Sequence, residues 1–292
     1  MLTQYLLSGL TAGAIYALVA LGFAIIYNAS HVINFAQGEF VMIGGMATAA
    51  LIELGLPLPL AIVIAIGIAT AVGLLLEKLA IEPARDASVV TLIIITIGAS
   101  ILLRGLATLV WDKKIHRLPA FSGETPIVLG GSAGSATLLP QVLWVLGAGA
   151  AAVALLTWFF RRTLAGKAIL AVSHNRLAAQ LVGISVRRAL LASFGLSAAL
   201  GALAGILIAP ISFTSWDVGV MLGLKGFAAA ILGGLGSSAG AVLGGLLLGL
   251  VESLGAGYLS SAYKDVFAFL VIFAALVFLP DGLLGRRTAE RV

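Results

Sequence analysis

The chain has 292 residues, of which 61% are hydrophobic and only 10% are charged, and its formal net charge is +5. An average soluble domain carries about 25% charged residues, so this composition excludes a water-soluble fold and indicates a membrane protein. The absence of cysteine excludes disulfides, thiol catalysis and cysteine metal sites. The basic residues lie in a few segments, which favours a positive-inside bias over nucleic-acid binding.

Successive apolar segments predict an all-α, polytopic helical bundle of eight or nine transmembrane segments. A helix needs about 20 predominantly apolar residues to cross a bilayer. No Lys or Arg precedes the first segment, and that segment is too long for the core of a signal peptide. We therefore expect a first membrane helix and no cleaved signal. The segments are 5–27, 40–53, 59–77, 89–110, 140–160, 188–209, 219–235, 238–256 and 264–280.

The breaks between these segments predict the topology. Stretch 77–88 is charged and is expected to leave the bilayer core, whereas 113–139 is polar, rich in Gly, Ser and Pro, and is expected to form a long external loop. Segment 161–188 contains six of the 17 basic residues and no acidic residue. The positive-inside rule therefore predicts that this segment is cytoplasmic.

The two chain ends differ in how firmly they can be oriented. The C-terminal tail contains Arg286, Arg287 and Arg291 and is predicted to be cytoplasmic. If 40–53 spans the membrane, there are nine crossings and the N-terminus is outside. If 28–52 is re-entrant, there are eight crossings and the N-terminus is inside. The sequence leaves both alternatives open.

Two polar interruptions, 28–39 and 212–226, each follow a long apolar segment and precede a short one that contains glycine. Paired interruptions in the two halves of a transporter indicate an internal repeat with a pathway at the interface of its halves. The sequence therefore predicts Gly-interrupted or re-entrant helices within the bundle.

Polar and ionisable residues at these interruptions are candidates for a substrate pathway. A dense polar run between apolar helices is costly unless it meets water or protein, so we assign Asn34, Gln37 and Glu39 to the pathway, together with Lys225 after the second interruption. For Arg104 and Glu252, which lie within apolar segments, structural pairing or snorkelling is the favoured interpretation. The first interruption contains Asn28, Ser30, His31, Asn34, Gln37 and Glu39.

Several catalytic motifs are missing. The Gly-rich stretch 233–240 (GGLGSSAG) has no Lys and lies in an apolar run, so it cannot hold ATP phosphates as a P-loop does. ATP-driven transport would need a partner subunit. The three histidines are far apart in sequence, so no metal site or cofactor is predicted. No nucleophile–base pair stands out, so the chain is not expected to be an enzyme.

The middle of the basic segment, 166–183, has helical spacing, and Leu170, Leu177, Ala178 and Leu181 are expected to share one face. An apolar helix face of this kind fits a groove on a partner protein. The alternative is an interfacial helix that lies on anionic lipid. The residues alone leave both interpretations open.

Four stretches resemble the LivH-type permease subunit of branched-chain amino acid ABC importers. The run INFA-x-GE and the ending YKD…P-x-G-x-LG are specific in combination, and the resemblance extends along essentially the whole chain. It implies an ABC importer permease fold, with 1–292 as a single transmembrane domain, in the bacterial inner membrane. The stretches are 9–27 (GLTAGAIYALVALGFAIIY), 32–45 (VINFAQGEFVMIGG), 223–240 (GLKGFAAAILGGLGSSAG) and 258–285 (YLSSAYKDVFAFLVIFAALVFLPDGLLG).

The resemblance also implies partners. These are a periplasmic or extracellular substrate-binding protein, a second permease that is expected to be a different chain, and two cytoplasmic ABC ATPases that hydrolyse the ATP. Arg104 stands where relatives are expected to have a neutral polar residue, so it is expected to pair with a carboxylate of this chain or of the partner permease. The loop that docks on the ATPases maps onto 161–188, with Gly166, Lys167, Asn175, Ala178, Ala179, Leu181, Gly183 and Ile184 as its candidate residues.

Two other functions remain open on the sequence. The cargo of such an importer depends on its binding protein, so urea or a short-chain amide is an alternative to a branched-chain amino acid. A more distant alternative is an ion-coupled secondary transporter, for which Glu39 or Glu252 would be candidate coupling residues.

Overall fold

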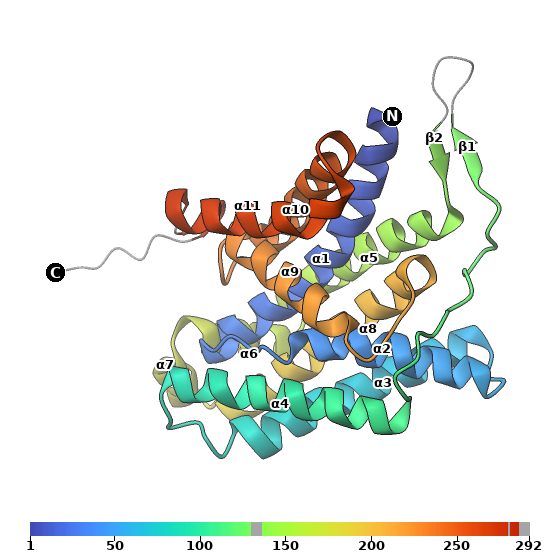
Figure 1. Cartoon of the computed structure of the whole chain (residues 1–292). Helices are drawn as coiled ribbons and strands as arrows, with labels where there is room; N and C mark the ends of the chain where they lie inside the picture. The colour runs from blue at the N-terminus through green and yellow to red at the C-terminus, as the bar shows by residue number, and fades with distance from the viewer. Residues whose placement is uncertain (130–135, 280, 286–292) are drawn as a thin grey trace.

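The computed structural model describes residues 1–129, 136–279 and 281–285, and most of them are helical. Figure 1 shows a bundle of helices with two short paired strands at one end. Within the described residues, seven helices are long and apolar enough to cross a membrane. The predicted all-α, polytopic fold is thus confirmed. These seven are α1 (Leu2–Ser30), α3 with its extension η1 (Leu58–Ile81), α4 (Val89–Val110), α5 (Pro140–Arg162), α8 (Val186–Ser212), α10 (Ser238–Tyr258) and η2 with α11 (Ser261–Phe278).

Local signals define where several helices begin. Proline lies at the start of α3 and α5, where its missing N–H costs nothing. Ser88 and Ser237 cap α4 and α10, because each hydroxyl accepts a hydrogen bond from a backbone N–H of the first turn. The helix boundaries therefore follow the proline and serine positions of the sequence.

Helices α1 and α8 form the centre of the bundle. Nearly all of α1 beyond its first turns is buried, and α8 is buried along most of its length. Large apolar side chains of α3, α4, α5 and α11 are exposed, as expected for surfaces that face lipid. Gly13 of α1 lies against the backbone of α10 at Gly245 and Leu246, the close approach of small residues that is typical of membrane helices.

The two predicted interruptions separate long helices from short ones. Helix α1 ends at His31, which has a positive φ of 57°, and α2 (Gln37–Glu53) begins only after a non-helical stretch. Helix α8 ends at Phe213, with φ of 61°, and α9 (Val218–Gly233) follows another non-helical stretch. At 17 and 16 residues, α2 and α9 are shorter than the seven long helices.

Two of the predicted loops contain short elements of secondary structure. In stretch 77–88, η1 (Glu77–Ile81) continues α3 as a π-helix and buries Glu77 within the protein. The long loop after α4 contains the antiparallel hairpin of β1 (Ile127–Leu129) and β2 (Ala136–Leu138). The basic tail with Arg286, Arg287 and Arg291 lies outside the described residues.

Candidate functional site

Helices α2 and α9 begin next to each other inside the bundle. Gly38 in the first turn of α2 lies against Gly219 and Gly223 of α9, so closely that an added Cβ atom would collide with the opposite backbone. Gln37 bonds to Ser197, near the middle of α8, so the contact lies deep between the ends of the long helices. Two helix N-termini, each with a partial positive charge, thus approach one interior point.

Asn34 and Gln37 hold the beginning of α2 in place. The Oδ1 atom of Asn34 accepts a hydrogen bond from the backbone N–H of Ala36 at 3.1 Å. The Nε2 atom of Gln37 donates to the carbonyl of Ser197, and the Ser197 hydroxyl donates to Gln37 Oε1 at 2.5 Å. Ser197 lies in an apolar segment and was not singled out by the sequence, because its role depends on which face of α8 meets α2.

Glu39 connects α2 to α4. The Ser100 hydroxyl donates to Glu39 Oε1 at 2.7 Å, and the Nε atom of Arg104 lies 3.4 Å from the same oxygen. This separation is that of an ion pair, although Arg104 Nε is not oriented for a hydrogen bond. Arg104 thus pairs with a carboxylate of its own chain, one of the two partners predicted for it.

Lys225 belongs to a separate charged cluster. Its ammonium lies 2.9 Å from Glu252 Oε1 and 2.6 Å from Asp265 Oδ1. Lys264 lies 3.2 Å from Glu252 Oε1, and the Tyr16 hydroxyl donates to Glu252 Oε2 at 2.9 Å. The cluster joins α9 to α1, α10 and α11, and its two lysines and two carboxylates sum to zero charge. The predicted structural pairing of Glu252 is present.

The structure therefore divides the predicted pathway residues into two groups. Asn34, Gln37 and Glu39 gather at the beginning of α2, whereas Lys225 faces the Glu252 cluster on another side of α9. Every one of these side chains is buried and has a partner within the chain. Their pathway role remains a prediction.

The basic segment folds as two short helices instead of one. Helix α6 (Leu164–His174) ends at Asn175, whose Oδ1 atom accepts from the Ala178 N–H and so begins α7 (Arg176–Leu181). The break at Asn175 places Leu170 on α6 and Leu177, Ala178 and Leu181 on α7, so the four residues do not lie on one continuous helix. Leu177 and Leu181 of α7, and Val182 directly after it, are exposed, with Leu181 88% exposed.

Two glycines of this segment occupy positions that disfavour a side chain. Gly183 has φ of 83°, its N–H donates to Gln180 O, and Ile184 N–H donates to Ala179 O. This is a Schellman termination, which favours glycine because its φ is left-handed. Gly166 packs against the backbone at Phe159, where a Cβ atom would collide. Of the remaining candidates, Lys167 and Ala178 are exposed, whereas Ala179 is buried.

At the end of the bundle opposite α6 and α7, His116 connects the loop after α4 to the end of α2 and to the stretch after α8. His116 Nδ1 lies 3.1 Å from Glu53 Oε1, and its backbone pairs with Thr214. Burial works against protonation of the imidazole. The hydrogen bonds to Glu53 and to the Trp111 carbonyl outweigh this effect and raise the pKa of His116 above its usual value. In the described part of the chain, no group of three His, Cys, Asp or Glu residues could hold a metal ion.

Comparisons with known proteins agree with this architecture. Residues 5–276 match the family described as branched-chain amino acid transport system / permease component. The chain is 36% identical to the high-affinity branched-chain amino acid transport system permease protein LivH of Escherichia coli K12, over 99% of this chain and 97% of that protein. It is 34% identical to BraD of Pseudomonas aeruginosa, a permease of the same description, with the same coverage.

A solved structure resembles the fold. PsaBC from Streptococcus pneumoniae in complex with Fab matches with a TM-score of 0.52 and 15% sequence identity, over 95% of this chain and 92% of that chain. At this identity the likeness concerns the arrangement of helices alone.

Proposed function

The chain belongs to the family of permease components of branched-chain amino acid transport systems, and we propose that it is the membrane-spanning subunit of an ATP-driven importer for branched-chain amino acids. The observation that carries this proposal is the 36% identity to LivH over nearly the full length of both proteins. The subunit would lie in the bacterial inner membrane. ATP hydrolysis would be performed by partner subunits, so the chain itself is a transport component and not an enzyme.

The proposed orientation has the basic segment 161–188 in the cytoplasm. Three contacts support a common side for this segment and the end of the chain. Arg176 donates to the carbonyl of Ala29 at the end of α1, and Asn28 donates to the carbonyl of Gly236, just after α9. The Leu283 N–H donates to the carbonyl of Leu232 at the end of α9. A cytoplasmic segment 161–188 therefore implies a cytoplasmic C-terminal end.

Helix α7 is the proposed coupling helix for one of two ABC ATPases. Its apolar residues Leu177 and Leu181, and Val182 directly after it, are exposed, whereas Ala179 is buried and packs with residues of α6 and α8. An exposed apolar helix face next to basic residues fits a groove on a partner protein. A second, different permease chain and an external binding protein would complete the importer.

The substrate pathway is proposed to pass the point where α2 and α9 begin. Asn34, Gln37 and Glu39 hold the beginning of α2, and Lys225 holds α9 against α10 and α11. In this proposal the four side chains position the two short helices, and the pathway passes the N-terminal ends of those helices. Broken helices are the usual sites of substrate passage in transporters.

Reconstitution tests the function directly. The importer would be assembled in liposomes from this chain, its partner permease, the ATPases and the binding protein. We expect ATP-dependent accumulation of labelled L-leucine, and none with a non-hydrolysable ATP analogue. Uptake by this chain alone, driven by an ion gradient, would contradict the importer function. Stimulation by urea-loaded binding protein, without any response to leucine, would contradict the cargo.

A further inference from the structure

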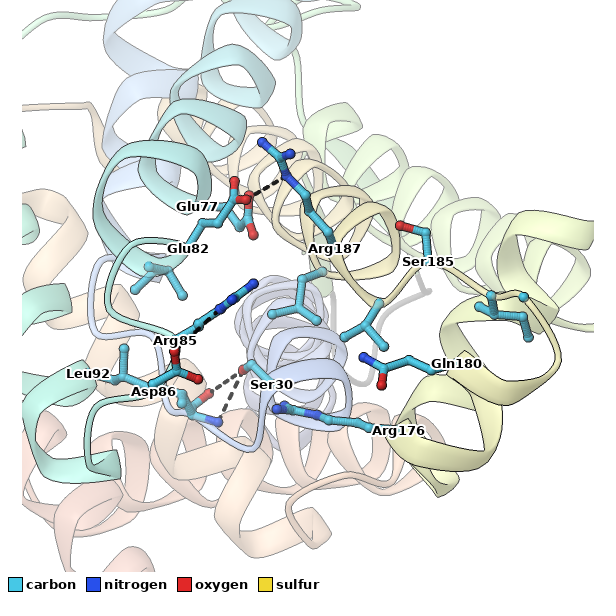
Figure 2. A pocket seen from close by; sticks show the side chains of 16 residues that line it. Ser30, Glu77, Glu82, Arg85, Asp86, Leu92, Arg176, Gln180, Ser185 and Arg187 are labelled. Atoms are coloured by element: carbon cyan, nitrogen blue, oxygen red, sulfur yellow. Dashed lines mark hydrogen bonds and ion pairs between the residues drawn. The ribbon is translucent and has the colours of Figure 1, made fainter.

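A pocket of about 630 Å³ lies beside α7, between the proposed coupling segment and η1. One wall is η1 and the loop after it, and the other is α7 with the beginning of α8. Figure 2 shows Glu77 and Glu82 on the first wall, with Arg187 of α8 reaching toward them. Arg176 and Gln180 of α7 lie on the other wall. Pockets of this size are typical of small-molecule sites.

The charges of the pocket are incompletely paired. Arg187 forms an ion pair with Glu82 at 2.6 Å, and Arg85 forms one with Asp86 at 3.5 Å. Among the described residues, neither Glu77 nor Arg176 takes part in a salt bridge. The pocket therefore keeps one carboxylate and one guanidinium group outside its salt bridges, although Arg187 also attracts the Glu77 carboxylate electrostatically.

Both of these groups also have an unsatisfied buried atom. Glu77 is 1% exposed, and its Oε2 atom has no hydrogen-bond partner in the described part of the chain. Arg176 donates from one terminal nitrogen to Ala29, but its buried Nε–H is likewise unpartnered. Burying a polar atom without a partner costs about 1–3 kcal/mol, and more if the group is charged. These atoms thus favour a ligand that supplies an ammonium and a carboxylate.

The backbone around Glu77 is unusual. Its carbonyl accepts a hydrogen bond from the N–H of Glu82 at 2.7 Å, five residues later, which makes η1 a π-helix. Single turns of π-helix are rare and occur frequently at functional sites. The pocket also has apolar lining residues, namely Val32, Ile81, Leu92, Ile184, Val186 and Leu190.

We propose that this pocket binds a zwitterionic amino acid with an apolar side chain on the cytoplasmic face, and that binding inhibits further import. The ligand's ammonium lies toward Glu77, its carboxylate toward Arg176, and its side chain on the apolar lining. The proposal rests on the proposed function, since it takes α7 as the coupling helix and the transported amino acid as the ligand. A molecule held between η1 and α7 favours the arrangement in which the two are this far apart, and so opposes movements of α7.

Proteoliposomes with ATP and unlabelled L-leucine in the lumen, where the cytoplasmic face points, provide the test. We expect initial ATP-driven uptake of labelled leucine to fall as luminal leucine rises. Glu77→Gln keeps the size of the side chain and removes the charge. We expect it to raise the luminal concentration for half-inhibition about tenfold while uptake into leucine-free vesicles is retained. Glu124→Gln, the same change in the loop at the opposite end, serves as the control.

A second measurement does not depend on any variant. Luminal 4-methylpentanoate lacks the ammonium of leucine and 3-methylbutylamine lacks its carboxylate, so we expect both to inhibit the wild-type importer less than leucine. Equal inhibition of wild type and Glu77→Gln, or equal potency of leucine and 4-methylpentanoate, would overturn the proposal. Normal uptake that is insensitive to luminal leucine would overturn it too. Failure of uptake into leucine-free wild-type vesicles would instead contradict the proposed function.

Discussion

The Nε atom of Arg104 lies 3.4 Å from the carboxylate of Glu39, so an arginine of an outer helix neutralises an acidic residue in the first turn of an inner one. Glu39 is fully buried and Arg104 only partly so. The two residues are thus expected to contribute jointly to the stability of the bundle, and a double-mutant cycle can measure their coupling.

Arg104→Gln and Glu39→Gln are each expected to lower the melting temperature in detergent, and the double variant to lower it by less than the sum. Interhelical polar pairs in membrane proteins have coupling energies of about 0.6 kcal/mol, with a maximum of about 1.7 kcal/mol. Strict additivity of the two single changes would contradict the ion pair. Ser100→Ala provides a neutral comparison, because it removes only a hydrogen bond to Glu39.

Lys225→Met is expected to destabilise the protein more than Lys264→Met. Lys225 is only 5% exposed and lies between two carboxylates, whereas Lys264 is 52% exposed and bonds to Glu252 from the edge. Removing one partner of a buried ion pair costs about 3–5 kcal/mol, whereas exposed pairs contribute about 0–1 kcal/mol. Thermal denaturation of both purified variants gives the comparison, and equal losses would argue against the burial of Lys225.

Gly38→Ala is expected to disrupt the contact between α2 and α9. An added methyl group meets the backbone of Gly219, which cannot move aside as a side chain can, so we expect a loss of at least about 1–3 kcal/mol from overpacking. Gly67→Ala on α3 makes the same change where nothing lies within 4 Å. We expect that variant to melt at or above the wild-type temperature. Indistinguishable melting of the two variants would refute the close approach.

Leu181→Asp tests the coupling role of α7. This side chain makes little contact with the rest of the chain, so we expect normal expression and melting but loss of ATPase co-purification and of transport. Leu54→Asp, an equally drastic change at an exposed leucine just after α2, is the control and should leave co-purification intact. If the Leu181→Asp variant still co-purified with the ATPases, the docking surface would lie elsewhere on the chain.

The pH dependence of stability should include a contribution from His116. Because hydrogen bonds to Glu53 and Trp111 raise its pKa in the folded protein, its stabilising effect is complete below the unfolded pKa and is lost as the pH rises through the folded value. His116→Gln should therefore flatten the fall in melting temperature from mildly acidic to mildly alkaline pH. If the melting temperature of His116→Gln fell with pH as steeply as that of the wild type, other groups would be responsible for the pH dependence.

The helices were predictable from the sequence because an apolar run of spanning length has few alternatives in lipid. The two interruptions were predictable for the same reason, since Asn34 and Asp217 lie in polar stretches that break the runs. The partners were not predictable. Ser197 meets Gln37, and Asp265 meets Lys225, only because particular helix faces come together. That choice depends on packing between helices distant in sequence.

The break at Asn175 and the burial of Glu77 were missed for different reasons. Asparagine is a favoured helix cap, so a signal for two helices was present within 161–188, but the apolar spacing on both sides of it suggested a single helix. Glu77 was expected outside the bilayer core because charged residues follow it. That expectation stays a prediction, and the structure adds that the π-helix buries Glu77 within the protein, a geometry that no local sequence rule predicts.

The charge cluster around Lys225 has a consequence for how the protein is made. Synthesis delivers Lys225 on α9 first, then Glu252 on α10, and only afterwards Lys264 and Asp265 at the beginning of α11. Until α10 emerges, the half-made chain holds Lys225 without a counter-charge, and α11 then adds one further lysine and one further carboxylate. The final transmembrane segments are therefore expected to leave the insertion machinery together, as an electrically neutral group.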